Sequence, residues 1–240
     1  MNIKITENTM FPIVEVSLNL NEQIIIESGS MVYHNGEVEL KGSMNSGGKK
    51  GIGGMIRSLG RSCASGESIY LTTVIGKTDT ARLGFAPILP GTIKKLNVGE
   101  THWRLNAGSF LGCEPTVSYN MKRQKVMASL FGSGGLFIME TCGSGELLIN
   151  SYGGILEINL TGDKPFVIDN NHVLAWTTTL DYKIKTASSF LGFSTGEGLV
   201  NEFYGRGSIL IQTRDIHGFA GLLSPVITRE SNVDKDFESF

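Results

Sequence analysis

The sequence predicts an all-β protein of three tandem β modules related by pseudo-three-fold symmetry, with only a few short helices. Two observations lead to this fold class. The 240 residues include 31 glycines but only 6 prolines, and the glycines separate many short apolar runs. Such spacing is typical of tight turns between short strands. In addition, one glycine-turn pattern occurs three times along the chain.

Each copy of this pattern consists of a glycine turn, a strand, a second glycine turn and a second strand. The copies start at Gly66, Ser133 and Gly196, at nearly equal intervals. A single unit is too small to bury its own apolar face, so neighbouring units are expected to pack on one another. The hydrophobic content of 40% and charged content of 18% fit a globular chain with a sizeable core.

The same recurrence predicts the domain organisation. We expect one domain over residues 1–229, with modules at about 1–85, 86–150 and 151–229. The last residues, 230–240, are acidic and show no periodicity, so a flexible tail is expected there.

The first module begins with a strand of the buried type at residues 23–27. The turn Asn35-Gly36 follows residues 31–33 and precedes residues 37–41, which alternate strictly between polar and apolar. Because Asn-Gly between alternating segments is a strong hairpin signal, we expect the two flanking strands to pair with each other.

The centre of the first module breaks this pattern. Residues 46–54 are too rich in glycine to hold a strand or helix. Residues 55–59 have the apolar spacing of one or two helical turns. The hairpin at Gly66 follows this segment.

Later strands repeat the same order. Residues 101–107 and 165–169 resemble the first strand and its turn, and Asn170 takes a place where glycine stands in the earlier copies. Residues 156–160 alternate cleanly. No amphipathic segment exceeds about two helical turns, so helices are expected to be minor.

Charge and cysteine usage set limits on function. The net charge of −2 argues against a dedicated nucleic-acid binder, whose domain is usually strongly basic. The three cysteines, an odd number without C-x-x-C spacing, are expected to be idle thiols. The N-terminal residues lack the apolar stretch of a signal peptide, and no apolar run is long enough for a membrane span. A cytoplasmic setting is therefore expected.

Two segments match catalytic or nucleotide motifs in part. Residues 192–196 fit G-x-S-x-G, but a strand-like run follows, whereas a nucleophile elbow needs a helix. Residues 76–78 read Gly-Lys-Thr, but Leu71 stands where a phosphate loop needs glycine. A turn explains each segment, so no catalytic residue and no cofactor are expected.

The histidines do not form a metal-ligand pattern, since none of them shows H-x-H or H-E-x-x-H spacing. They are His34, His102, His172 and His217. We therefore expect no metal.

Two glutamates are shared between copies of the glycine turn. Glu67 and Glu197 hold the same place, and Gly134 holds it in the middle copy. A carboxylate in such a turn accepts hydrogen bonds from nearby backbone N–H groups, which is a sufficient structural role. These three positions are candidate turn or interface residues, and general acid–base catalysis is the alternative.

A basic cluster interleaved with apolar residues lies in the first module. We call it the basic loop; it comprises Lys49, Lys50, Ile52, Met55, Ile56, Arg57, Leu59 and Arg61. The alternatives are a loop with a core-packing turn, or a docking surface for a partner subunit or an anionic membrane. The loop carries no aromatic residue to stack a base, so RNA is disfavoured.

The glycine signatures together resemble those of a known family. They are Gly29-Ser30-Met31-Val32-Tyr33, Ser65-Gly66-Glu67-Ser68, Ala86-Pro87, Pro90-Gly91, Ser109-Phe110-Leu111, Val167-Ile168-Asp169, Gly196-Glu197-Gly198-Leu199-Val200 and Ile211-Gln212-Thr213-Arg214. In this order they are similar to the altered-inheritance-of-mitochondria (mitochondrial biogenesis) family, from about residue 3 to 229. Gly134 departs from the family's Gly-Glu-Gly pattern, which argues against a symmetric three-glutamate site.

The resemblance implies an all-β fold of the short double-stranded β-helix type, with three modules like those of the tryptophan RNA-binding attenuation protein. It also implies a homo-oligomeric ring, with a trimer favoured, and no established enzyme activity. In fungi the family is associated with inner-membrane organisation in mitochondria.

Three functions follow as hypotheses. The first is a non-enzymatic oligomeric scaffold or assembly protein, because the chain combines a recurring unit with near-neutral charge. The second is a ring that binds RNA or a small ligand, by analogy of fold alone. The third is a hydrolase or isomerase that uses Glu67 or Glu197.

Overall fold

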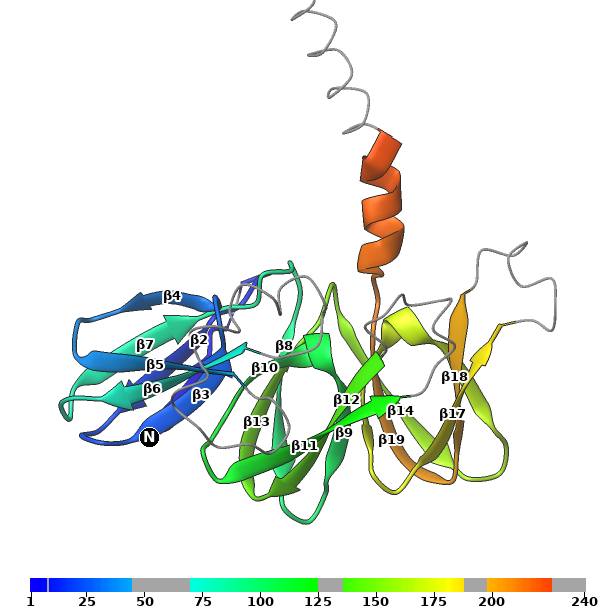
Figure 1. Cartoon of the computed structure of the whole chain (residues 1–240), viewed down its shortest axis with the longest axis horizontal. Coiled ribbons are helices and arrows are strands. Elements are labelled where there is room, and N and C mark those ends of the chain that lie inside the picture. The colour runs from blue at the N-terminus through cyan, green and yellow to red at the C-terminus, as the bar shows by residue number, and fades with distance from the viewer. Residues whose placement is uncertain (8, 45–69, 125–135, 188–197, 226–240) are drawn as a thin grey trace, which may run out of the picture.

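The computed structural model describes residues 1–7, 9–44, 70–124, 136–187 and 198–225 of the chain. The described part is built almost entirely from β-strands, which confirms the predicted all-β class. The strands fall into three successive groups that lie in a row along the molecule (Figure 1). We call these groups the first, second and third strand sets.

An initial strand, β1 (Asn2–Ile5), precedes the sets. The first set is β2 (Val14–Leu18), β3 (Gln23–Glu27), β4 (Met31–His34), β5 (Val38–Met44), β6 (Tyr70–Gly76) and β7 (Ala81–Phe85). The second set is β8 (Ile93–Val98), β9 (Trp103–Asn106), β10 (Phe110–Cys113), β11 (Val117–Gln124), β12 (Leu136–Gly143) and β13 (Gly145–Asn150). The third set is β14 (Ile155–Thr161), β15 (Phe166–Asp169), β16 (Val173–Thr177), β17 (Asp181–Thr186), β18 (Leu199–Tyr204) and β19 (Arg206–Gln212). Two short 3-10 turns, η2 (Ala107–Ser109) and η3 (Asn170–His172), stand between the second and third strands of their sets.

The same antiparallel pairing recurs in every set. The first and third strands flank the sixth, as β2 and β4 flank β7, β8 and β10 flank β13, and β14 and β16 flank β19. The second and fourth strands flank the fifth, as β3 and β5 flank β6, β9 and β11 flank β12, and β15 and β17 flank β18. Each set thus supplies two three-stranded half-sheets, and the chain crosses between them.

A register shift marks the third strand of every set. It lies between Met31 and Tyr33 in β4, and at the corresponding places in β10 and β16. A bulge bends a strand and strengthens its twist. Because the bulge recurs, the residues of the three sets can be aligned one by one: Met31, Phe110 and Val173 hold the same place, since they pair with Phe85, Ile149 and Ile211.

The half-sheets of neighbouring sets join into larger sheets. The strand β3 pairs with β10, which gives the six-stranded sheet β5-β6-β3-β10-β13-β8. The strand β9 pairs with β16, which gives the second six-stranded sheet, β11-β12-β9-β16-β19-β14. Each of these sheets therefore consists of half of one set and half of the next.

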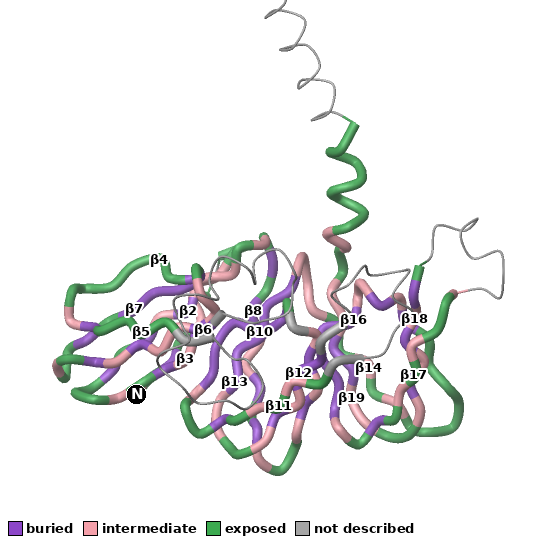
Figure 2. Tube along the Cα trace, in the orientation of Figure 1, coloured by how far each residue is buried: buried purple, intermediate pink, exposed green. Residues whose placement is uncertain are grey.

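The hydrophobic core continues across these junctions. Leu111 and Leu148 of the second set belong to the cluster that fills the first set. Likewise Leu71 and Leu174, from the two outer sets, belong to the cluster of the second. Buried residues accordingly run through the whole row (Figure 2).

The hairpin predicted at Asn35-Gly36 is wrong in its pairing. Gly36 does adopt the left-handed turn conformation, with φ of 87°. The strands on either side belong to different sheets, however, because β4 pairs with β7 and β5 pairs with β6. The same holds after Gly66, where β6 and β7 are consecutive but do not pair. A turn signal fixes where the chain reverses but not which sheet it enters.

One helix that the sequence analysis did not predict follows the third set. Residues 216–225 are helical and project away from the sheets (Figure 1). The Asp215 side chain caps the helix, since its carboxylate oxygens accept hydrogen bonds from the backbone N–H groups of His217 and Gly218, both at 2.9 Å. Among the described residues, no helix has the length and apolar character needed to cross a bilayer.

Candidate functional site

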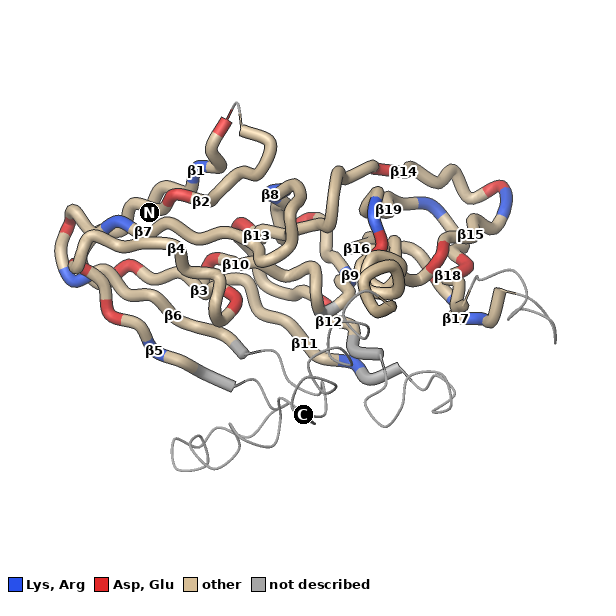
Figure 3. The backbone as a smooth tube through the Cα atoms, turned by 90° about the horizontal axis from the view of Figure 1, so that it is seen from above, with Lys and Arg blue, Asp and Glu red and all other residues tan. Residues whose placement is uncertain are grey.

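Two half-sheets at the ends of the row are incomplete. The first, β1-β2-β7-β4, ends at β4, and the last, β15-β18-β17, ends at β15. Inside the row, third strands pair with second strands of the preceding set, as in β3 with β10 and β9 with β16. The strands β4 and β15 are the third and second strands that lack such a partner in the described chain, and Figure 3 shows them in opposite halves of the row.

The open edge at β4 is apolar although it faces solvent. Its counterparts β10 and β16 are buried at every residue. All four residues of β4 are exposed instead, and the side chain at its centre, Val32, is 56% exposed. Edge strands are normally protected by charges, proline or a covering loop. An apolar edge that no described segment covers is a candidate surface for pairing with another strand.

The open edge at β15 also exposes apolar side chains. Its counterpart β9 has Trp103 and Leu105 buried. In β15, Phe166 aligns with Trp103 but is exposed, and Val167, which aligns with Arg104, is 56% exposed, whereas Ile168 is buried like its counterpart Leu105. Both ends of the row thus present a short apolar strand whose outer edge pairs with no strand of the described part.

Side-chain hydrogen bonds reinforce the junction between the second and third sets. The amide of Asn106 donates to the Val173 carbonyl at 2.5 Å. The hydroxyl of Ser109 donates to the Leu174 carbonyl at 3.0 Å. Strand pairing between sets is therefore accompanied by side chains that satisfy the backbone of the next set.

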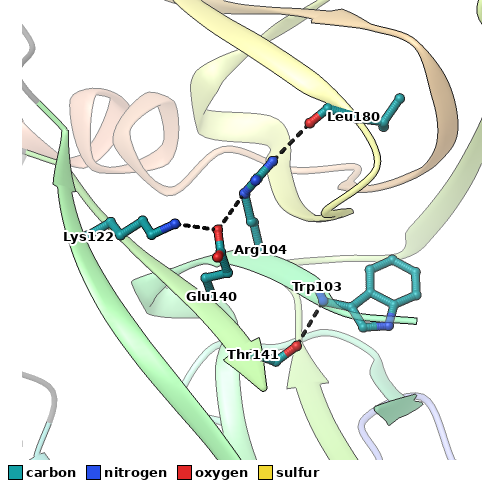
Figure 4. Close-up of polar contacts among 6 residues, drawn as sticks. All are labelled: Trp103, Arg104, Lys122, Glu140, Thr141 and Leu180. Carbon is teal, nitrogen blue, oxygen red and sulfur yellow. Dashed lines mark hydrogen bonds and ion pairs between the residues drawn. The ribbon is translucent and has the colours of Figure 1, made fainter. Parts of the chain in front are cut away.

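A charged cluster lies beside the same junction (Figure 4). The Glu140 carboxylate accepts from Lys122 Nζ and from Arg104 Nε, each at 2.8 Å. Arg104 also donates from Nη1 to the Leu180 carbonyl of the third set at 2.9 Å. Hydrogen bonds from Lys122 and then Arg104 lower the pKa of Glu140. This carboxylate is thus kept ionised and engaged, which suits a structural tie better than proton transfer.

A related pair lies at the free end of the third set. Lys185 and Glu202 form an ion pair in the place that Lys122 and Glu140 hold in the second set, and Tyr204 also donates to Glu202. The hydrogen bond from Lys185, followed by that from Tyr204, lowers the pKa of Glu202. The lysine–glutamate ion pair therefore recurs in the third set. The position that Arg104 holds at the internal junction is occupied there by Val167 of the open edge.

Glu27 holds the place of Asn106 at the junction between the first and second sets. Glu27 is the last residue of β3 and Asn106 is the last residue of β9, and these are the second strands of their sets. Burial raises the pKa of Glu27 to about 7. A protonated carboxyl group at this position has an O–H donor, as the Asn106 amide has an N–H donor.

The predicted site residues lie outside the described residues. These are Glu67, Gly134 and Glu197, together with the whole basic loop: Lys49, Lys50, Ile52, Met55, Ile56, Arg57, Leu59 and Arg61. The acidic tail at 230–240 lies outside them as well. These assignments stay predictions.

Two histidines in the described part make local hydrogen bonds through their side chains. The His34 Nδ1 atom accepts from the Gly36 N–H at 2.9 Å, and His172 Nδ1 lies 2.7 Å from the Gln212 carbonyl oxygen. Within the described ranges, no group of three His, Cys, Asp or Glu side chains is placed to hold a metal. Cys113 and Cys142 are free thiols.

Sequence reasoning missed both open edges. Residues 31–33 and 165–169 were recognised as strands, but an apolar strand reads the same at an edge as inside a sheet. The open edges become visible only when the three sets are compared. In that comparison β4 and β15 are the outermost strands of the recurring pairing.

Comparison with known proteins identifies relatives of this chain. The family model described as mitochondrial biogenesis AIM24 matches residues 3–214. An uncharacterized protein of Streptococcus pyogenes serotype M6 is 41% identical over 234 residues, which cover 97% of this chain and 93% of that protein. The crystal structure of a protein from Streptococcus pyogenes superimposes with a TM-score of 0.77 at 39% identity, covering 94% of this chain and 99% of that one. On this evidence the chain belongs to the mitochondrial biogenesis AIM24 family.

Proposed function

We propose that this chain is a non-enzymatic assembly protein that forms a closed homo-oligomeric ring, with β15 of one copy pairing with β4 of the next. One observation carries the proposal. The two incomplete sheets at the ends of the row are the two halves from which each internal six-stranded sheet is made. Joining them between copies would complete a third sheet of the same kind, with β1 added at its edge.

The proposal treats the three strand sets as modules of an internal repeat. Their recurring pairing and bulges support this treatment. A repeat module continues its pairing until something caps it, and uncapped ends tend to associate. The apolar side chains on both open strands support association in preference to capping.

The internal junctions predict the register between copies. Gly112 pairs with Ile26 at the first junction, and Ala175 pairs with Leu105 at the second. In the aligned sets these pairs correspond to Tyr33 of one copy opposite Ile168 of the other. The next pair along the strand is His34 opposite Val167. This register places the exposed apolar residues of β15 against β4.

The contact is head to tail, because it joins two different surfaces. A heterologous contact of this kind produces a ring if its rotation closes, or a filament if it does not. The two open strands lie in opposite halves of the row, so they meet only between copies (Figure 3). We favour a trimer, in keeping with the expectation drawn from the sequence.

A cytoplasmic location fits this proposal. Cys113 and Cys142 are unpaired, as expected for a reducing compartment. Glu140 and Glu202, two carboxylates with lowered pKa, are held by cations in structural contacts. A scaffold role therefore accounts for the charged clusters without requiring a reaction.

Light scattering coupled to size-exclusion chromatography tests the proposal. At micromolar concentration the particle is expected to have about three times the chain mass of 26.0 kDa. A mass equal to one chain would contradict assembly. A discrete dimer would contradict the trimer that we favour.

A further inference from the structure

We propose that the helix at residues 216–225 of one copy docks on an apolar surface of the next copy, formed by Met10, Phe11 and Ile88. This inference rests on the ring proposed above and names a second contact between its copies. It concerns surfaces away from the open strands β4 and β15.

The helix is exposed although its side chains are apolar. Residues 216–225 contain no Asp, Glu, Lys or Arg. Phe219 and Leu223 are exposed, and Leu222 is 75% exposed. Figure 2 shows the helix exposed along the described turns beyond its base.

Its base is fixed to the third set. The ring of Phe219 packs against that of Tyr152, with centroids 6.1 Å apart. The Asp215 cap sets the position of the first turn. The direction of the helix is thus determined by contacts with its own chain, whereas its outer turns touch none of the described residues closely enough to be buried.

Such a helix needs a partner to persist in water. This helix contains Gly218 and Gly221, and each glycine costs about 1 kcal/mol relative to alanine in a helix interior. It also lacks the charged side chains that form stabilising pairs along a helix surface. Burial of its apolar side chains is the remaining source of stability.

The receiving surface is equally apolar and equally exposed. Met10 is 82% exposed and Ile88 is 79% exposed, and Phe11 is exposed as well. Met10 and Phe11 precede β2, and Ile88 follows β7. Since Val14 of β2 pairs with Phe85 of β7, the three side chains belong to the same end of that strand pair.

The aligned sets place this surface beside the helix of the preceding copy. Ile211 in the third set corresponds to Phe85 in the first, because they pair with Val173 and Met31. After Phe85 the chain crosses to the second set, whereas after Ile211 it enters the helix. In the ring, the set that follows the third set is the first set of another copy. The chain of that copy enters its first set directly after Met10 and Phe11.

The helix therefore starts where a linker would cross to the next set, and the surface lies where that linker would arrive. The internal linkers are close neighbours on this side, since Gly91 and Gly153 form a bridge and the Thr213 N–H donates to the Gly154 carbonyl at 3.0 Å. Both partners are uncharged and apolar, so docking would remove exposed apolar area from water on each.

Photo-cross-linking tests this contact in the assembled full-length protein. The photoreactive residue p-benzoylphenylalanine replaces Leu222, which is exposed enough to accept it. Illumination is expected to join two chains through position 222. The other end of the link is expected on tryptic fragment 5–41, which contains Met10 and Phe11, or on fragment 83–94, which contains Ile88. The same photoreactive residue at Leu156, an exposed position in β14 that lies in neither fragment, serves as the matched control and is expected not to link to these fragments.

A second variant checks that the contact is specific. Replacing Met10 and Phe11 by serine is expected to lower the cross-linked fraction at least about tenfold, because two buried apolar side chains are lost. The particle mass is expected to stay the same. An unchanged cross-linked fraction would overturn the proposal.

Each other outcome has a definite meaning. A cross-link to the helix of another copy would overturn the proposal, as would a cross-link within the same chain. Flotation of the wild-type chain with phosphatidylcholine vesicles, abolished by Leu222→Ser, would assign the helix to a lipid surface instead. A ring without the cross-link would remove this inference alone, whereas a monomer by light scattering would remove the ring and the inference together.

Discussion

Tyr33 and Gly84 are cross-strand partners in which a large ring lies directly over a residue without a side chain. A Cβ atom at Gly84 would stand 2.2 Å from Cε1 of Tyr33. The Tyr33 hydroxyl donates to Glu15 Oε1 at 2.9 Å, which holds the ring in place. In the second and third sets the size order is reversed, with Gly112 opposite Leu148 and Ala175 opposite Leu210. The sets thus keep one large and one small residue at this pair while exchanging the strand that carries the large one.

This relationship predicts the effect of Gly84→Ala. The added methyl group displaces the Tyr33 ring, so unfolding by urea should show a loss of about 1–3 kcal/mol. Gly42→Ala is the matched control, because a Cβ atom there meets nothing within 4 Å. Adding Tyr33→Ala to Gly84→Ala should recover much of the loss in a double-mutant cycle. If the two losses simply add, the packing account of this pair is wrong.

The charged cluster predicts unequal costs for its two cations. Arg104 is 20% exposed and joins two sets, whereas Lys122 is 51% exposed. Arg104→Met leaves the Leu180 carbonyl without its donor and should cost about 2–3 kcal/mol in urea unfolding, while Lys122→Met should cost less than about 1 kcal/mol.

The pH dependence of the Arg104→Met effect has a definite sign. The pKa of Glu140 is lowered in the folded chain, so the stability it contributes is present above its ordinary value of 4.5 and is lost as pH falls. The difference between wild type and Arg104→Met should therefore shrink below about pH 4.5. Equal costs for the two variants at pH 7 would contradict the role given to Arg104.

Glu27 predicts the opposite pH dependence. Burial raises its pKa from 4.5 to about 7, so the folded chain binds the extra proton between these values. The stability of the wild type should therefore fall as pH rises through this window. Glu27→Gln keeps a donor and removes the charge. It should match the wild type near pH 5 and exceed it by about 1–2 kcal/mol at pH 8, a figure reduced for solvent access to this half-buried side chain.

Thermal unfolding at several pH values measures this effect. Glu100→Gln, at an exposed glutamate in the turn after β8, is the control and should not change the pH profile. Parallel profiles of wild type and Glu27→Gln would show that Glu27 is not the group responsible.

The open edge at β15 predicts a variant that folds but does not assemble. Val167→Lys places a charge on an exposed strand residue, so the chain should keep the fold and the circular dichroism spectrum of the wild type. Light scattering should nevertheless give a smaller particle, because an edge lysine opposes strand pairing. Leu20→Lys, which alters a similarly exposed apolar residue in a turn, should assemble normally. Assembly of both variants would exclude β15 from the interface.

The sequence predicted the fold class and the family because both depend on local patterns. Glycine turns between short apolar runs indicate strands, and the order of the glycine signatures carries the resemblance. The pairing of strands could not be predicted in the same way. Asn35-Gly36 marks a true turn, but the choice between pairing β4 with β5 or with β7 depends on residues far along the chain.

The helix at residues 216–225 left a weak signal. Asp215 precedes apolar residues at helical spacing, namely Ile216, Phe219 and Leu223, which is a typical N-terminal pattern. Gly218 and Gly221 weaken this pattern, because glycine is unfavourable in a helix interior. The open edges left no local signal, since exposure of Val32 and Val167 results from position in the row and not from residue type.

The most direct test of the ring is disulfide trapping of its proposed register. With cysteines at positions 34 and 167 of one chain, His34→Cys and Val167→Cys, mild oxidation should link copies covalently up to the size of the closed ring. Tyr33→Cys with Val167→Cys is the matched control, because a shift of one residue turns the side chain to the opposite face of the strand. The account predicts linked chains for the first pair and background for the second; equal linking by both pairs, or by neither, would contradict pairing of β4 with β15.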